Sequence, residues 1–151
     1  MTGQTLFWYA PWPEQDSNGV RVATWVRDRL GYFRAFRAFR GSRMRSIQEA
    51  HFVSAPIDLE GKAARLLLNV DGITEQSGVS VEILDEKFNN VPGYNAESCL
   101  TLTESGFEQT VRWRDQESIS HIAGPIRVRV NFTGLRPEDV RLYALYLREV
   151  D

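Results

Sequence analysis

From about residue 50 onward, hydrophobic and polar residues alternate one by one along the chain. In the clearest run, the hydrophobic side is Ile126, Val128, Val130 and Phe132, and the polar side is Arg127, Arg129 and Asn131. Alternation with a period of two is the signature of a half-buried β-strand. Similar runs lie at 64–70, 79–83 and 110–114. Each run predicts a strand with one face in a core.

A further run, residues 140–147 (VRLYALYL), is hydrophobic on both faces apart from Arg141. This pattern predicts an inner strand that is covered on both sides. Turn signals such as Asp71-Gly72 and Gly124-Pro125 separate the runs, and no long helical pattern lies between them. Residues 135–139 (LRPED) suit one helical turn, because proline is tolerated in a first turn. The predicted fold class is all-β, an antiparallel, jelly-roll-like β-sandwich.

The pattern also predicts which side chains form the core. One large aromatic, Trp113, alternates with arginines and is assigned to the core rather than to the surface. The predicted core comprises Leu66, Leu68, Val79, Val81, Ile83, Val111, Trp113, Ile126, Val128, Val130, Phe132, Leu142 and Tyr146.

The first 46 residues add two or three strands of a different character. Residues 6–10 (LFWYA) and 20–26 (VRVATWV) are predicted strands joined by a polar loop. Residues 33–40 (FRAFRAFR) fit neither the helical nor the strand period, because phenylalanine recurs every three residues. We interpret this segment as an irregular extended strand whose arginine stems cover apolar surface.

The N-terminal strands expose apolar side chains and unpaired edges unless something covers them. One solution is that they fold back to extend the sandwich's own sheets, with Phe33, Phe36 and Phe39 buried beneath it. The other is that two copies of the chain pair through this region, so that both a monomer and a homodimer are open. We favour the first, because it costs only loop entropy and needs no minimum concentration.

Charge is distributed unevenly along the 151 residues. Residues 21–45 hold eight Arg and one Asp, a net charge of +7, whereas the remainder holds ten basic and nineteen acidic residues, a net charge of −9. The predicted basic patch consists of Arg34, Arg37, Arg40, Arg43 and Arg45. Interleaved Arg and Phe suggest single-stranded nucleic-acid binding through segment 21–45. The acidic remainder argues against that function, because it would repel phosphate.

Five stretches, in this order, resemble a known module. They are LLLNVDG (66–72), VSVEILDEKFNNVPGY (79–94), AESCLTLTESG (96–106), TVRWRDQESISHIAGPIRVRVNF (110–132) and DVRLYALYL (139–147). Together they resemble the C-terminal β-sandwich that follows the five-bladed propeller in bacterial proteins related to glycoside hydrolase families 32 and 43. Residues 19–33 (GVRVATWVRDRLGYF) are similar to the end of that propeller.

The resemblance implies a division at residue 46. Residues 1–46 would be N-terminal strands and a basic linker resembling the end of a propeller, and residues 47–151 the sandwich domain. The propeller blades that carry the catalytic acids in that family are absent from this chain. The resemblance therefore implies a non-catalytic accessory module that binds carbohydrate or packs against a propeller-type partner. A structural or protein-interaction domain without sugar affinity is the alternative.

The side chains themselves point to no reaction. Acidic residues at strand ends and turns (Asp58, Asp71, Glu82, Asp85, Glu86, Glu97 and Glu104) are interpreted as solvated surface rather than as a paired acid and base. The lone Cys99 is interpreted as a buried structural cysteine. The chain has two His and one Cys, fewer than the four Cys or His ligands of a typical structural zinc site, so no metal or cofactor is expected. A structural calcium at a turn aspartate, Asp71 or Asp85, remains open.

Sugar binding would rest on aromatic rings that present a flat face to the ligand. Trp12 lies between two prolines in a loop, Tyr94 follows the Pro92-Gly93 turn, and Trp8 is in a predicted strand, so these three are the candidates. Packing within the core or a turn is the competing interpretation for each ring. The chain shows neither a signal-peptide pattern nor an apolar stretch long enough for a membrane span, which predicts a cytoplasmic protein.

Overall fold

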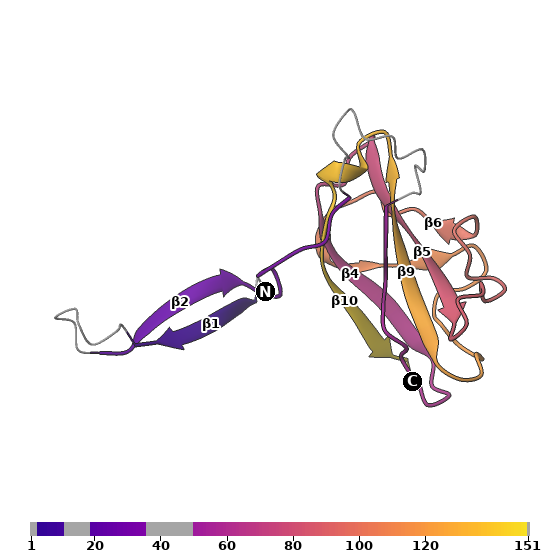
Figure 1. The fold of residues 1–151 in the computed structure, drawn as a ribbon, viewed down its shortest axis with the longest axis horizontal. Helices are drawn as coiled ribbons and strands as arrows, with labels where there is room; N and C mark the ends of the chain where they lie inside the picture. The colour runs from indigo at the N-terminus through magenta and orange to yellow at the C-terminus, as the bar shows by residue number, and fades with distance from the viewer. Residues whose placement is uncertain (1–2, 11–18, 36–49, 151) are drawn as a thin grey trace.

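The computed structural model describes residues 3–10, 19–35 and 50–150, which form an all-β structure (Figure 1). Helical structure in the described residues is limited to one short 3₁₀ turn, η1. The strands are β1 (Gln4–Tyr9), β2 (Arg21–Val26), β3 (His51–Val53), β4 (Ala64–Asp71), β5 (Ser77–Asp85), β6 (Cys99–Leu100), β7 (Gly106–Thr110), β8 (Arg112–Trp113), β9 (Ile126–Gly134) and β10 (Arg141–Glu149). The predicted fold class is confirmed.

Two three-stranded sheets form the body of the molecule, with strand orders β10-β4-β7 and β3-β9-β5. All pairings are antiparallel, and the longest ladder joins β5 to β9 from Ser77↔Gly134 to Asp85↔Ile126. A short ladder between β6 and β8 makes a third, two-stranded sheet. Side chains from both three-stranded sheets meet in one hydrophobic core, as an antiparallel sandwich requires.

The predicted core is buried as one cluster, with the exception of Tyr146. Trp113 is only 2% exposed, and its indole Nε1 donates a hydrogen bond to the Val81 carbonyl at 3.0 Å. Tyr146 lies half-buried on the outer side of β10, where its hydroxyl donates a hydrogen bond to Asp28. Core members that the pattern did not single out include Val70, Tyr94, Cys99, Ile119 and Val140.

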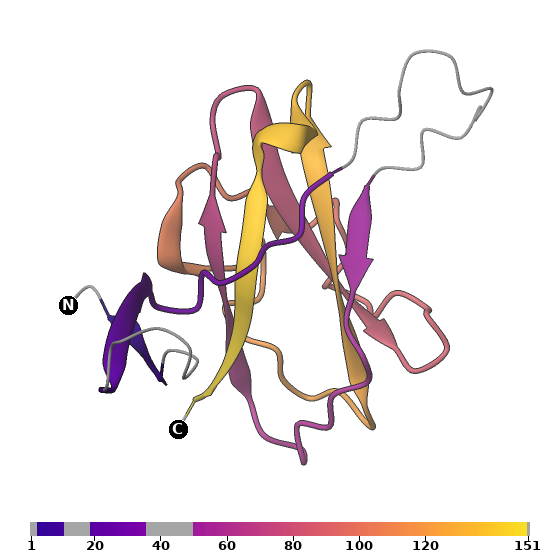
Figure 2. The ribbon, with the colours of Figure 1, turned by 60° about the vertical axis from the view of Figure 1, so that its left-hand side comes forward.

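The prediction that residues 140–147 form an inner strand is wrong. β10 pairs with β4 along one edge. Along the other edge, its one pairing within the described residues is with Phe33, through two backbone hydrogen bonds of 2.8 Å to Leu142. Its outer side chains are apolar because residues 27–35, here called the strap, pass across that side of the strand (Figure 2). Coverage by a strap and coverage by a second sheet leave the same pattern in the sequence.

The predicted helical turn is present as η1 (Pro137–Asp139), which leads from β9 into β10. The turn packs tightly against the end of β4. Gly72 has a φ of +75°, and a Cβ added to it would collide with the Asp139 carbonyl oxygen. Only glycine suits this position without a shift of the backbone.

β1 and β2 form an isolated hairpin that projects away from the sandwich (Figure 1). Six residue pairs, from Gln4↔Val26 to Tyr9↔Arg21, define its register. Neither strand pairs with a strand of the sandwich, so the expectation that these strands extend the sandwich's sheets is wrong. We call this hairpin, residues 3–10 and 19–26, the arm.

Phe33 also differs from its prediction. It is 55% exposed, although its ring contacts Phe52 with the ring centroids 4.7 Å apart. Ala35, two residues later, is buried in the core. The strap therefore closes part of the core with a small side chain. Phe36 and Phe39 lie outside the described residues.

Candidate functional site

Both faces of the arm are hydrophobic. The cross-strand pairs Trp8↔Val22 and Leu6↔Thr24 place one set of side chains together, and Phe7↔Ala23 with Thr5↔Trp25 define the other face. Trp8 is 70% exposed and Trp25 is 51% exposed. A two-stranded hairpin with solvent on both faces has no core of its own and is marginally stable at best.

The edge of β1 is unprotected. Its six residues, QTLFWY, include no charged side chain and no proline. Soluble proteins usually guard an edge strand with charges, prolines or bulges, because its free N–H and C=O groups can pair with another chain. β2, by contrast, begins with Arg21. The β1 edge is therefore the part of the arm best suited to pair with a further strand.

Arg29 fixes the strap to the sandwich through side chains from all three strands of one sheet. Its Nε donates a hydrogen bond to Asn69 Oδ1 on β4 at 3.0 Å. Its guanidinium carbon lies 4.4 Å from the ring centroid of Phe107 on β7 and 4.6 Å from that of Tyr143 on β10. Planar stacking of this kind suits Arg better than Lys.

The joint between arm and strap is also held by specific contacts. The Trp25 Nε1 donates to the Arg29 carbonyl at 3.0 Å, and the Tyr146 hydroxyl donates to Asp28 Oδ2 at 2.7 Å. Asp28 itself adopts a left-handed φ of 55°. Burial, followed by the hydrogen bond to Asp28, raises the pKa of the Tyr146 hydroxyl. The arm thus leaves the sandwich from a defined position.

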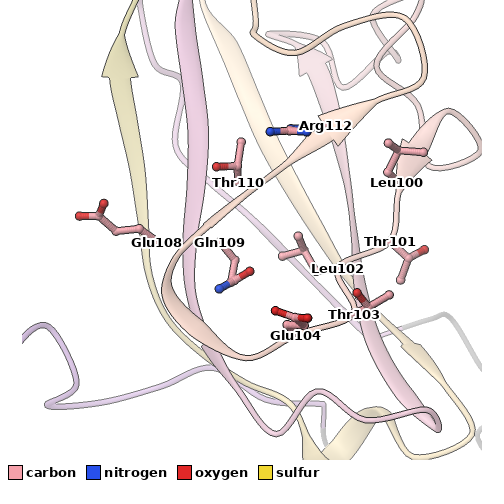
Figure 3. Close-up of a pocket in the computed structure, with 9 residues that line it drawn as sticks. All are labelled: Leu100, Thr101, Leu102, Thr103, Glu104, Glu108, Gln109, Thr110 and Arg112. Carbon is pink, nitrogen blue, oxygen red and sulfur yellow. The ribbon is translucent and has the colours of Figure 1, made fainter. Parts of the chain in front are cut away.

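A second candidate is a polar groove beside β7 (Figure 3). It lies between residues 100–104 and 108–112 and has a volume of about 360 Å³. Leu102 and Gln109 point toward its interior. Glu108 points away from it and pairs with Arg148 at 2.9 Å. Thr101, Thr103 and Thr110 also contribute to its lining.

Two of the three predicted sugar-binding aromatics, Tyr94 and Trp8, lie in different parts of the molecule. Tyr94 is 4% exposed, packs edge-on against Trp113 at 5.0 Å, and donates its hydroxyl to the Ser118 carbonyl at 3.1 Å. Its prediction as a surface platform is therefore wrong, because the ring points into the core toward Trp113. Trp8 is exposed, but on the arm. Trp12 lies outside the described residues.

Most of the predicted basic patch, Arg37, Arg40, Arg43 and Arg45, also lies outside the described residues. Arg34 is exposed, and it lines a hollow shared with Asp71, Glu138, Asp139 and Arg141. The surroundings of Arg34 are therefore mixed in charge. Arg29, in the same basic stretch, is occupied by Asn69 and the two rings. It is unavailable to a phosphate.

Two of the predicted surface carboxylates have structural roles. Glu82 is buried rather than solvated: its Oε2 lies 3.4 Å from Arg129 and accepts a hydrogen bond from Asn131 at 3.0 Å. Asp85 accepts hydrogen bonds from Lys87 and Asn89, and the Asn89 side chain is the main reason that the pKa of Asp85 lies below its usual range.

Cys99 is buried, as predicted, and its sulfur accepts a hydrogen bond from the Val81 amide at 3.1 Å. Burial raises the pKa of its thiol. Within residues 3–10, 19–35 and 50–150, no three His, Cys, Asp or Glu side chains gather closely enough to hold a metal. Of the two aspartates considered for calcium, Asp71 forms an ion pair with Arg29, with Oδ2 3.7 Å from the guanidinium nitrogen. Asp85 accepts a hydrogen bond from the Lys87 amide within its own turn.

The sequence interpretation missed the part played by Arg29. The signal that could have found it is Asn69, a polar residue in the otherwise apolar stretch LLLNV. Asn69 is fully buried, and a buried amide requires a hydrogen-bond partner from elsewhere in the chain. A search for that partner would have drawn attention to the arginines of the N-terminal segment.

Comparisons with models of protein families, with curated proteins and with solved structures return no match. The resemblance to the sandwich of glycoside-hydrolase-like proteins therefore remains a hypothesis. None of the described helical structure has the length and apolarity needed to cross a membrane.

Proposed function

We propose that this chain is a non-catalytic β-sandwich module whose function is to dock onto a protein partner through its arm. The observation that carries the proposal is the exposure of eight large apolar side chains on one short hairpin: Leu6, Phe7, Trp8, Tyr9, Val20, Val22, Trp25 and Val26. They lie on both faces of the hairpin, and Trp8 is the most exposed of them at 70%. Extended exposed apolar surface on a folded protein marks an interaction site.

The strap supports the same function. Arg29 and Asp28 hold the root of the arm against the sandwich, so a partner meets it in a preset position. Leu30 and Tyr32 on the strap are exposed as well, which extends the apolar surface from the arm toward the sandwich. Preorganisation of this kind lowers the entropy cost of docking. An accessory module that packs against another protein, such as the propeller-type partner suggested by the resemblance, would have these properties.

Hydrogen exchange of the purified chain at high dilution tests the proposal. The amides of β1 and β2 should exchange far faster than those of β5 and β9, because a free hairpin has no packing to protect it. Slow exchange of the arm in a dilute monomer would show that it is packed on its own sandwich, and the docking function would be abandoned. Turnover of aryl-glycosides by the same sample would overturn the non-catalytic assignment.

Carbohydrate binding is the second candidate, and the groove beside β7 is the observation that favours it. Threonine hydroxyls and the Gln109 amide can exchange hydrogen bonds with sugar hydroxyls, and Leu102 supplies an apolar surface. Affinity electrophoresis in polysaccharide gels tests this. Retardation that disappears in Gln109→Ala but persists in Trp8→Ala would place the sugar in the groove, and no retardation in any gel would remove the candidate.

A further inference from the structure

We propose that the partner of the arm is a second copy of the same chain, with β1 of one copy pairing antiparallel with β1 of the other across a twofold axis. This inference rests on the proposed docking function and names its partner. The result is a continuous four-stranded sheet, ordered β2-β1-β1-β2, between two sandwiches. The free edge of β1, which carries no charge and no proline, forms its centre.

The free edge of a β-strand can pair antiparallel with the same edge of a second copy. When a strand pairs antiparallel with a copy of itself, each hydrogen bond made in one direction is repeated in the other, so the interface is isologous and closes at two copies. The pairing therefore satisfies the free backbone groups without leaving a new edge of the same kind. The outer edges of the new sheet are the β2 strands, which begin with Arg21.

The faces of the arm restrict the register of this pairing. A twofold axis perpendicular to the sheet keeps each face on its own side, so a residue can oppose only residues of the same face. Centring the axis on Phe7 places it opposite Phe7 of the second copy, and Leu6 opposite Trp8 of the second copy. Aromatic pairs and aromatic–aliphatic pairs of this kind stabilise cross-strand contacts. Moving the axis to Leu6 would instead set Trp8 opposite the polar Gln4 of the second copy.

Charge is compatible with the same partner. Residues 19–35 hold four Arg and one Asp, a net charge of +3, and residues 3–10 hold no charge. Residues 50–150 hold ten basic and fifteen acidic side chains, a net charge of −5. In this pairing the root of each arm lies beside the tip of the other, so the two basic roots stay at opposite ends of the four-stranded sheet. The uncharged β1 strands meet without repulsion.

Sedimentation equilibrium of the full chain over a range of concentrations is the first test. We expect a monomer–dimer equilibrium for the wild type. Phe7→Lys should raise the dimer dissociation constant by about tenfold or more, because it sets two like charges directly opposite each other at the axis. Leu135→Lys is the matched control: Leu135 is 78% exposed in the loop before η1, far along the sequence from the arm, and its substitution should leave the equilibrium unchanged.

A cysteine cross-link tests the register. Phe7→Cys should form an intermolecular disulfide under mild oxidation, since residues opposite each other in a ladder have Cα atoms about 4.5–5.5 Å apart. Thr24→Cys, which is also exposed but on β2, should not cross-link, because two β1 strands separate it from its counterpart. The wild type, whose one cysteine is the buried Cys99, supplies the background.

The possible outcomes separate this inference from the docking function. A monomer at all concentrations, with rapidly exchanging arm amides, would overturn the second copy as the partner and leave the arm free for a different protein. A monomer with protected arm amides would overturn both proposals. Open-ended association without a defined dimer, or equal cross-linking of Thr24→Cys and Phe7→Cys, would overturn the twofold pairing.

Discussion

The arm and the sandwich are built from similar strands but differ in what covers them. β5 has every residue from Ser77 to Leu84 buried, whereas β1 has only Thr5 half-buried and its other five residues exposed. Both strands are rich in β-branched or aromatic side chains. The difference lies in the second layer: β5 faces the opposite sheet, while the arm faces solvent on both sides. Hydrophobic side chains stabilise a fold only when another surface removes them from water.

Substitution of a single tryptophan should show the largest difference in stability between the sandwich and the arm. Trp113→Ala empties a fully packed site and removes the hydrogen bond to Val81, so it should cost about 3–5 kcal/mol in the free energy of unfolding. Trp8→Ala should cost under about 0.5 kcal/mol in dilute solution, where Trp8 has little to pack against. Urea denaturation measures both, and similar losses would mean that the arm shares the sandwich's core.

Glycine-to-alanine substitutions compare how tightly the backbone is packed in the sandwich and in the strap. Gly72→Ala should destabilise the protein by at least about 2 kcal/mol, because φ is positive and the new Cβ meets the Asp139 carbonyl. Gly31→Ala, in the strap, should change stability little, since nothing lies within 4 Å of the added atom. Thermal unfolding compares the two. A tolerated Gly72→Ala would show that η1 is not held against β4.

Loss of the Arg29 side chain should loosen the strap. Arg29→Ala removes two cation–π contacts and leaves the buried Asn69 without its partner, which should cost about 1–2 kcal/mol. Arg27→Ala is the control, because its exposed pair with Asp28 is worth under about 0.5 kcal/mol. Hydrogen exchange across 29–35 should accelerate only in the first variant. Equal effects of the two variants would show that Arg29 does not act as the anchor.

The smallest effect concerns pH. Burial raises the pKa of the Cys99 thiol, so the folded protein keeps this proton at a pH where the unfolded chain has released it. The resulting stability is fully present below the unfolded thiol's pKa of about 8.5 and is lost as the pH rises through the folded-state pKa. Stability measured from pH 7 to pH 10 should therefore fall more steeply in the wild type than in Cys99→Ala. Parallel slopes would contradict the burial of the thiol.

The sequence predicted the strands and most of the core because both follow from alternation with a period of two. The alternate residues Ile126, Val128, Val130 and Phe132 could be assigned to the core-facing side of one strand from the sequence alone. The structure confirms that assignment. β10 was misassigned, because alternation reports whether a side chain is covered and not which element covers it. Its cover, the strap, lies more than a hundred residues earlier in the chain.

The candidate sites were harder to predict, because they depend on long-range placement. Tyr94 follows a turn that looks exposed in the sequence, but the direction of its ring is set by Trp113 and the Ser118 carbonyl. The groove beside β7 joins two segments that carry no distinctive motif. The arm was recognised as a pair of apolar strands, yet only the three-dimensional arrangement shows that the sandwich does not cover them.

The short connection at the root of the arm limits how far the arm can swing. Only Arg27 and Asp28 separate the end of β2 from the anchored Arg29, and two or three extended residues reach about 10 Å at most. The arm therefore searches a small volume and keeps its orientation relative to the sandwich. Whatever captures the arm also sets the direction in which the sandwich points, so the module can act as a spacer of fixed geometry rather than as a loosely tethered domain.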